Sequence, residues 1–223
     1  MLNPLLRGLS LALWAVVLLQ SSVDGRLDLL LRAAFHPLVS AAGVVLLVLA
    51  LLQVLTGLRN REGTTGQRDG RLSVITAAIA LLLILWPPNP SFADLASQRP
   101  GDDTTAQSLS FVLPPAQRSL TDWVRLLRSQ PDPQLFDGDP VRISGFLLPV
   151  PGQPPQIARL LVRCCLADAT PVGLPVRWPT DQPLPRADQW LAIEGTMAAE
   201  NDQLVVVPAV IRPIPRPARP LEP

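Results

Sequence analysis

Several kinds of residue are rare or absent in this chain of 223 residues. It contains no tyrosine, one histidine and no lysine, so that all 19 of its basic residues are arginine. No Ser/His/Asp signature, phosphate-binding lysine or dinucleotide-binding glycine motif is present, which argues against hydrolases and nucleotide-binding enzymes. The formal net charge of +1 provides no field that would attract nucleic acid. We therefore expect neither an enzyme nor a nucleic-acid-binding protein.

Cysteine is equally scarce, since the chain has only two, the neighbours Cys164 and Cys165. Neighbours in a trans chain hold their Cα atoms about 3.8 Å apart, below the roughly 4.4 Å at which ordinary disulfides begin. An ordinary intrachain disulfide is therefore excluded. The remaining roles are a strained vicinal disulfide, a reduced and inert pair, a link to another chain, or a site for a soft metal such as zinc or copper(I).

The residues around the two cysteines predict that the pair lies at the end of a strand. Residues 157–162 form an apolar run, closed by the two cysteines, that is typical of a buried strand, and residues 172–178 predict a second strand after a turn. Asp168 lies three residues beyond Cys165, in that turn. Its carboxylate either caps the turn or adds a third ligand to the two thiolates.

The abundant residues are apolar, at 48% of the chain, while charged residues make up 17%. Within residues 1–88, three apolar segments at about 5–23, 38–56 and 72–86 predict a membrane anchor of two to three transmembrane helices. A spanning helix needs roughly 20 residues, so the first two are long enough. The third is short, and a buried or re-entrant segment competes with a spanning helix there.

Arginine in one loop predicts the topology. Arg59, Arg61, Arg68 and Arg71 lie between the second and third apolar segments, which makes this loop cytoplasmic by the positive-inside rule. The N-terminus is then cytoplasmic too, and everything after Trp86 is extracytoplasmic. We expect a multi-pass protein of the bacterial inner (plasma) membrane.

The predicted topology makes the only histidine a further candidate ligand. His36, at the outer end of the second helix, faces the same compartment as the cysteines under this topology. It is either an ordinary interfacial residue or a further ligand for the metal, because a closed zinc site needs four ligands.

Residues 89–118 are rich in Pro, Ser and Asp and predict a linker. Residues 119–128 begin with a capping Ser and place apolar side chains on one face, which predicts a short amphipathic helix. Five strand-like runs follow, at 141–148, 157–164, 172–178, 190–197 and 204–211. Their number and spacing predict a small, mainly-β, OB-like five-stranded barrel over residues 119–212, followed by a Pro-rich tail at 213–223.

Four short segments resemble the bacterial YcgQ-type proteins: Arg-Ile-Ser-Gly-Phe at 142–146, Arg-Cys-Cys-Leu-Ala-Asp-Ala at 163–169, Trp-Leu-Ala-Ile-Glu-Gly at 190–195, and His-Pro at 36–37. Those are small membrane proteins described as permease subunits and paired with a larger permease. The resemblance implies a membrane-anchored accessory domain whose partners are the lipid bilayer and a permease of a separate chain.

Together these observations predict a non-enzymatic accessory subunit. In the most concrete version, its extracytoplasmic domain binds zinc, copper or another solute through Cys164, Cys165 and Asp168, with His36 as a further ligand. The alternatives are a membrane-anchored thiol redox protein and a purely structural interaction module with inert cysteines.

Overall fold

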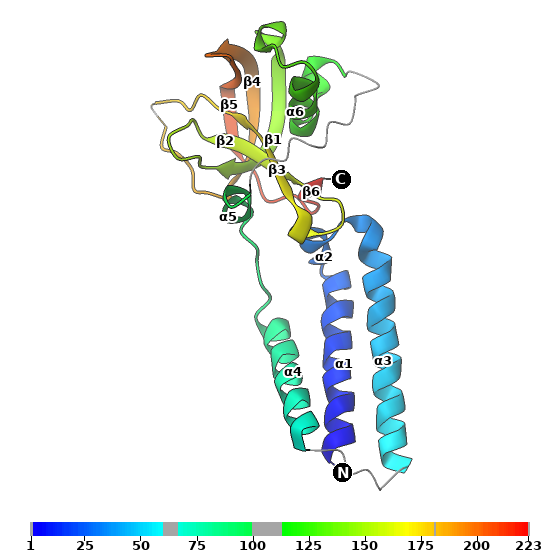
Figure 1. The fold of residues 1–223 in the computed structure, drawn as a ribbon. Coiled ribbons are helices and arrows are strands. Elements are labelled where there is room, and N and C mark those ends of the chain that lie inside the picture. The colour runs from blue at the N-terminus through cyan, green and yellow to red at the C-terminus, as the bar shows by residue number, and fades with distance from the viewer. Residues whose placement is uncertain (1, 60–66, 100–112, 181, 223) are drawn as a thin grey trace. The chain divides into compact units, whose positions relative to one another are not determined.

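The computed structural model describes residues 2–59, 67–99, 113–180 and 182–222. The chain divides into two compact units, Met1–Pro90 and Ser91–Pro223. The first unit is helical and the second is built on a β-sheet (Figure 1).

The first unit contains three long helices: α1 (Leu2–Val23), α3 (His36–Arg59) and α4 (Gln67–Leu85). The short helix α2 (Leu27–Leu30) and the 3-10 turn η1 (Ala33–Phe35) connect α1 to α3. Each long helix covers one of the three apolar segments found in the sequence, apart from Trp86, which follows α4. Helix α4 ends before Pro87-Pro88, as expected because a residue that precedes proline is disfavoured in the α conformation.

Helix α1 packs against both α3 and α4. Gly8 permits a close approach to α3, since a Cβ at Gly8 would lie 2.9 Å from Cγ2 of Val54. A hydrogen bond of 2.8 Å between the hydroxyls of Ser10 and Thr76 connects α1 to α4. Small residues and polar pairs of this kind are typical of packed transmembrane helices.

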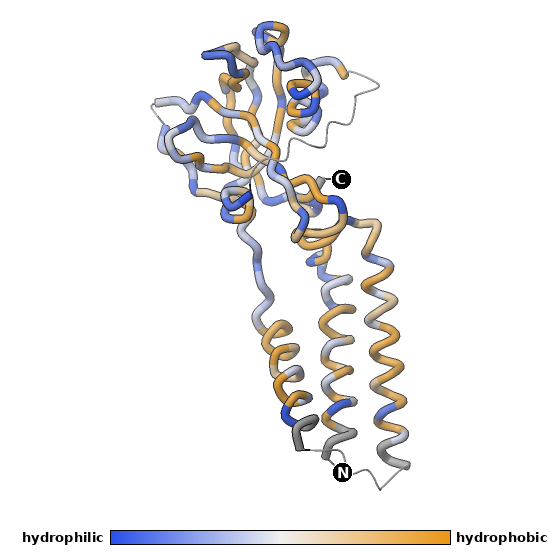
Figure 2. The backbone as a smooth tube through the Cα atoms, viewed as in Figure 1, coloured by the Kyte–Doolittle hydropathy of each residue, from blue (hydrophilic) through white to orange (hydrophobic). Residues whose placement is uncertain are grey.

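Two helical segments are long and apolar enough to cross a membrane, Leu6–Val23 and Ala33–Thr56. The apolar part of α4, Arg71–Leu85, is shorter. Apolar residues dominate the long helices (Figure 2), and several of their large side chains, such as Leu51 and Leu82, are exposed. The expectation of two to three membrane helices is therefore confirmed as a helical apolar region with two candidate spans. Arg61, which contributed to the predicted topology, lies outside the described residues.

The second unit is built on a six-stranded sheet, in which five strands follow the order β3-β2-β1-β4-β5 with neighbouring strands antiparallel. The strands are β1 (Pro140–Leu148), β2 (Gln156–Leu161), β3 (Thr170–Pro175), β4 (Trp190–Glu200) and β5 (Gln203–Pro213). A parallel bridge between Val176 and Val206 brings the two ends of this order together. The predicted OB-like fold is confirmed as a partly open barrel.

Helix α6 (Leu120–Ser129) covers the core of this barrel, as the sequence predicts. The Ser119 side chain accepts a hydrogen bond from the N–H of Asp122, and the Asp122 carboxylate accepts one from the N–H of Ser119. This reciprocal capping fixes where the helix begins. Leu120, Trp123 and Leu126 are buried in the barrel core.

The barrel unit begins earlier than residue 119. The short helix α5 (Phe92–Ser97) lies in the stretch 89–118 that the sequence assigned to a linker. Phe92 is fully buried, with its ring 5.9 Å from that of Phe146 and 6.5 Å from that of Trp190. The N–H of Ala93 donates to Asp188 Oδ1 over 2.5 Å. These contacts make α5 part of the barrel unit, while residues 100–112 of the expected linker lie outside the described residues.

The Pro-rich tail also returns to the barrel. The N–H of Ile214 donates to the carbonyl of Trp190 over 2.9 Å, and the Arg216 guanidinium lies 4.8 Å from the centroid of the Phe92 ring. The tail ends in a short strand, β6 (Leu221–Glu222), which pairs in parallel with Leu160 and Leu161 of β2. Arg216 and α5 therefore pack on each other, although more than a hundred positions separate them in the sequence.

Candidate metal centre

Cys164 and Cys165 lie in the loop between β2 and β3, with the 3-10 turn η4 (Leu166–Asp168) directly after them. The sequence placed Cys164 at the end of a strand, but β2 ends at Leu161. The reason is local competition for hydrogen bonds. The side chain of Asp168 accepts from the N–H groups of Arg163 and Cys164, so these groups take no part in pairing between strands.

The Asp168 carboxylate holds the loop closed. Its Oδ1 accepts from the N–H of Arg163 over 2.9 Å, and its Oδ2 accepts from the N–H of Cys164 over 2.8 Å and, more weakly, from that of Cys165 over 3.4 Å. This is the turn-capping role considered for Asp168 from the sequence. The same bonds fix the carboxylate beside the two thiols, because an ionised carboxylate accepts several hydrogen bonds at once.

Both thiols are free and half-buried, and they converge on this carboxylate. The two Sγ atoms are 3.5 Å apart, and Cys164 Sγ donates to Asp168 Oδ2 over 2.9 Å. One ligand atom from each of Cys164, Cys165 and Asp168 lies within 4.8 Å of the other two. Two thiolates that bind one zinc ion at about 2.3 Å in tetrahedral geometry lie about 3.8 Å apart, so the observed spacing needs little adjustment.

The site has a definite protonation state at neutral pH. The hydrogen bond to Asp168, followed by that to Cys165 and by partial desolvation, raises the pKa of the Cys164 thiol from 9.0 to about 12. Partial burial acts to raise the pKa of Asp168, but the hydrogen bonds from the Cys164 thiol and from three backbone N–H groups outweigh it and lower that pKa below 3.8. Cys164 is thus a thiol and Asp168 a carboxylate at pH 7.

This protonation state bears on two possible roles of the cysteines, thiol–disulfide exchange and metal binding. Thiol–disulfide exchange needs a thiolate nucleophile, and a thiol with a pKa of about 12 supplies very little at neutral pH. A metal ion, in contrast, displaces the thiol proton when it binds, because its own charge stabilises the thiolate. The geometry therefore favours cation binding over redox exchange.

Arg99 holds the same loop from outside. Its Nη1 donates to the carbonyl of Leu166 over 3.2 Å and to that of Ala169 over 2.5 Å. These carbonyls belong to the first residue of η4 and to the residue just after it. Sequence reasoning missed Arg99, because its partners are backbone carbonyls, which no residue type or spacing reveals.

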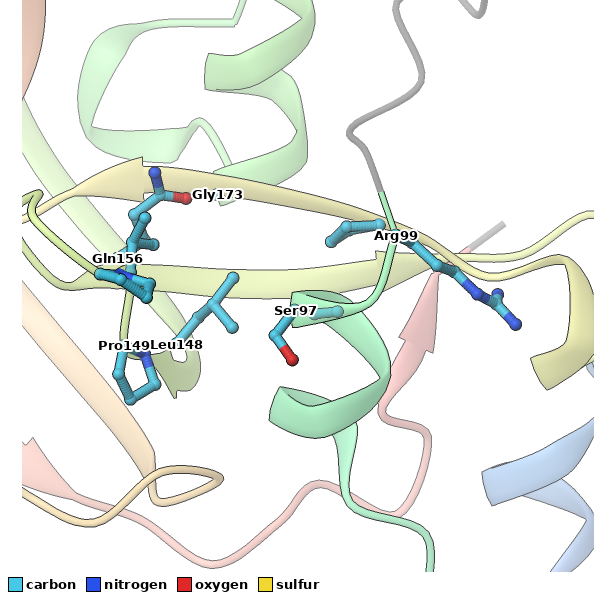
Figure 3. A pocket seen from close by; sticks show the side chains of 10 residues that line it. Ser97, Arg99, Leu148, Pro149, Gln156 and Gly173 are labelled. Carbon is cyan, nitrogen blue, oxygen red and sulfur yellow. The ribbon is translucent and has the colours of Figure 1, made fainter.

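A cavity of about 380 Å³ lies beside Arg99. Its lining includes Ser97 at the end of α5 and Arg99 just after it, together with Leu148, Pro149, Gln156 and Gly173 from the strands and their connections (Figure 3). Figure 3 shows the guanidinium of Arg99 directed away from Gln156 and Pro149. The guanidinium of Arg99 therefore forms its hydrogen bonds with the cysteine loop, and the lining of the cavity is mainly apolar.

His36, the remaining residue of the predicted site, belongs to the helical unit. Its Nε2 lies 3.3 Å from the carbonyl oxygen of Leu31 and 3.9 Å from Oδ1 of Asp28. The described cluster of ligands consists of Cys164, Cys165 and Asp168. Participation of His36 stays a prediction.

Residues 117–212, from the turn before α6 to the end of β5, match a known protein family. The model that they match describes the DUF1980 C-terminal domain. None of the curated proteins matches the chain. The matched residues include the cysteine loop and the strands β1 to β5 except the last residue of β5, whereas α5, Arg99 and the tail lie outside the matched residues.

Proposed function

We propose that this protein is an accessory subunit of a membrane permease and that its DUF1980 C-terminal domain binds a soft metal ion, zinc or copper(I). The observation that carries the proposal is the convergence of two thiols and a carboxylate within 4.8 Å in one half-buried loop. Sulfur ligands select zinc and copper(I) over magnesium and calcium, which prefer oxygen. Three protein ligands leave a position open, as suits a site that accepts and releases its ion.

The permease partner is supported by the likeness of this chain to YcgQ-type proteins in the segments around Phe146, the cysteines and Trp190. The two helices that are long and apolar enough to cross a membrane support an anchor in the bacterial inner membrane. In this arrangement the subunit performs no chemistry. It receives an ion outside the cytoplasm and presents it to the permease.

A purely structural role for the cysteines explains the geometry less well. A buried and inert cysteine is usually surrounded by apolar side chains. Here Cys164 donates to an ionised carboxylate, and both cysteines are half-buried. The loop therefore combines soft ligands, a negative charge and access to solvent.

The test is metal stoichiometry of the full-length protein in detergent, kept reduced and titrated with zinc and with copper(I). We expect about one ion per chain, none after Cys164→Ser/Cys165→Ser, and weaker binding after Asp168→Asn. Asp122→Asn is the matched control, because Asp122 occupies the equivalent capping position in α6 without a thiol beside it. Equal metal content in the parent and in the double serine variant would refute the site.

A further inference from the structure

Arg99 forms hydrogen bonds at both ends of the turn that contains Asp168, one of the proposed ligands. Its Nη1 donates to Leu166 O and to Ala169 O, and η4 runs between these two carbonyls. Displacement of Arg99 would remove two hydrogen bonds from a turn of three residues, and Asp168 is the last of the three. The position of the carboxylate relative to the thiols therefore depends on where Arg99 is held.

Arg99 is held by α5. Phe92 at the start of this helix is fully buried against Phe146 and Trp190, and the N–H of Ala93 donates to Asp188. The end of α5 is less tightly packed, because Ala96, Ser97 and Arg99 line the cavity of about 380 Å³ described above (Figure 3). The two hydrogen bonds of Arg99 connect the end of α5 to the cysteine loop, on the side of Arg99 that faces away from the cavity (Figure 3).

The chain itself connects α5 to α4. Helix α4 ends at Leu85 and α5 begins at Phe92, and the residues between them include Pro87, Pro88 and Pro90. Proline-rich segments are stiff and extended, so they transmit a displacement better than a flexible chain of the same length. A movement of the end of α4 would therefore reach α5 and, through Arg99, the turn that carries Asp168.

We propose that Arg99 is a positioning residue of the cysteine site and couples its occupancy to α5, the segment through which the chain leaves helix α4. This inference rests on the proposed metal binding at the same site. The coupling works in both directions, since any coupling between two binding or conformational equilibria is reciprocal. Metal binding orders α5, and a displaced α5 weakens metal binding. A permease that moves α4 would thereby control release of the ion.

The experiment compares the full-length parent, Arg99→Ala and Arg142→Ala in detergent, by zinc competition titration and by hydrogen exchange with and without zinc. Arg142 is the control, because it loses the same charge but pairs with Glu194 on the neighbouring strand. We expect Arg99→Ala to lower zinc affinity by about 10- to 100-fold, the usual effect of removing a residue that orients a metal ligand. The metal stoichiometry and the affinity of Arg142→Ala should equal those of the parent.

Hydrogen exchange distinguishes two roles of Arg99: coupling of the metal site to α5, and stabilisation of the cysteine loop alone. In the parent, zinc should slow exchange in peptides covering residues 92–99 as well as 163–169. In Arg99→Ala the slowing at 92–99 should disappear, and exchange of 163–169 without metal should become faster. Zinc that slows exchange at 163–169 alone in the parent would overturn the coupling, and so would parental affinity in Arg99→Ala, both with metal binding intact. A parent that binds neither zinc nor copper(I) would remove the proposed function and this inference with it.

Discussion

The thiol of Cys164 lies 2.9 Å from Oδ2 of Asp168, and the carboxylate is at the same time fixed by the N–H groups of Arg163 and Cys164. A metal ion that binds both residues takes the place of the thiol proton in this contact. In the proposed metal site the carboxylate is therefore oriented before a cation binds, and the backbone bonds that orient Asp168 remain when the proton leaves. Such preorganisation reduces the cost of binding.

The first prediction concerns this contact. Asp168→Asn in the Cys165→Ser background should lower the raised pKa of Cys164 toward its ordinary value of 9.0, because the neutral amide no longer opposes the thiolate. More thiolate at a given pH speeds alkylation, while the lower basicity of the sulfur partly offsets the gain. We expect a rate about tenfold higher near pH 9, measured with iodoacetamide on metal-free protein. Asp122→Asn in the same background should leave the rate unchanged, and a pH profile unaffected by Asp168→Asn would contradict the prediction.

The second prediction is that zinc binds more tightly as the pH rises. Cys164 is protonated throughout the neutral range because Asp168 raises its pKa to about 12, so binding must release its proton. Each proton released raises the apparent affinity by about tenfold per unit of pH, and titrations between about pH 6 and pH 8 should show at least this slope. Calorimetry in two buffers of different ionisation enthalpy counts the protons directly. Affinity that is independent of pH would mean that Cys164 is not a ligand.

Much of the fold follows from local patterns. The apolar segments are long and continuous, the Ser119 cap precedes an amphipathic run, and the five strands are separated by turn-forming residues. These features depend on neighbours in the sequence. The helix α5 does not, since six residues are too few to show a helical period. It is stabilised by burial of Phe92 against Phe146 and Trp190, which the sequence places far away.

The candidate site also has one part that the sequence predicts and another part that it does not. The adjacent cysteines and Asp168 are visible as residue types with metal-ligand chemistry, and the structure brings them together. The end of β2 was placed too late, because apolar character continues to Val162 while the hydrogen bonds of Arg163 and Cys164 go to Asp168. Arg99 could not be predicted at all, since it acts on carbonyls that every residue possesses.

The third prediction concerns independent folding. The sequence predicts that residues 119–223 fold without the helices, and the packing of α5 indicates that residues 91–223 form a more stable fragment. Phe92→Ala in the longer fragment should lower the free energy of unfolding by about 3–5 kcal/mol, as expected for truncation of a buried aromatic residue. Leu135→Ala is the control, because Leu135 is 61% exposed. Urea denaturation followed by tryptophan fluorescence gives both values, and equal stability of the two fragments would show that α5 contributes little.

The fourth prediction is the membrane topology. Arg59, Arg61, Arg68 and Arg71, which lie where α3 ends and α4 begins, predict by the positive-inside rule that this end of the helices is cytoplasmic, so the barrel unit should lie outside. Alkaline phosphatase, which is active only outside the cytoplasm, should be active when fused after residue 223 and inactive when fused after residue 59. The opposite pair of results would reverse the topology and remove the proposed role in extracytoplasmic metal delivery.

The last prediction concerns His36. Cys164, Cys165 and Asp168 supply one ligand each, whereas a closed zinc site has four, and under the predicted topology His36 faces the same compartment as the cysteines. If its imidazole completes the site in the full-length protein, His36→Ala should weaken zinc binding by at least about tenfold, because part of the binding free energy is lost with a ligand. Phe35→Ala is the matched control, since it alters the neighbouring side chain and leaves the imidazole in place. Parental affinity in His36→Ala, together with no binding in Cys164→Ser/Cys165→Ser, would confine the site to the cysteine loop and leave its fourth position to solvent or to the permease.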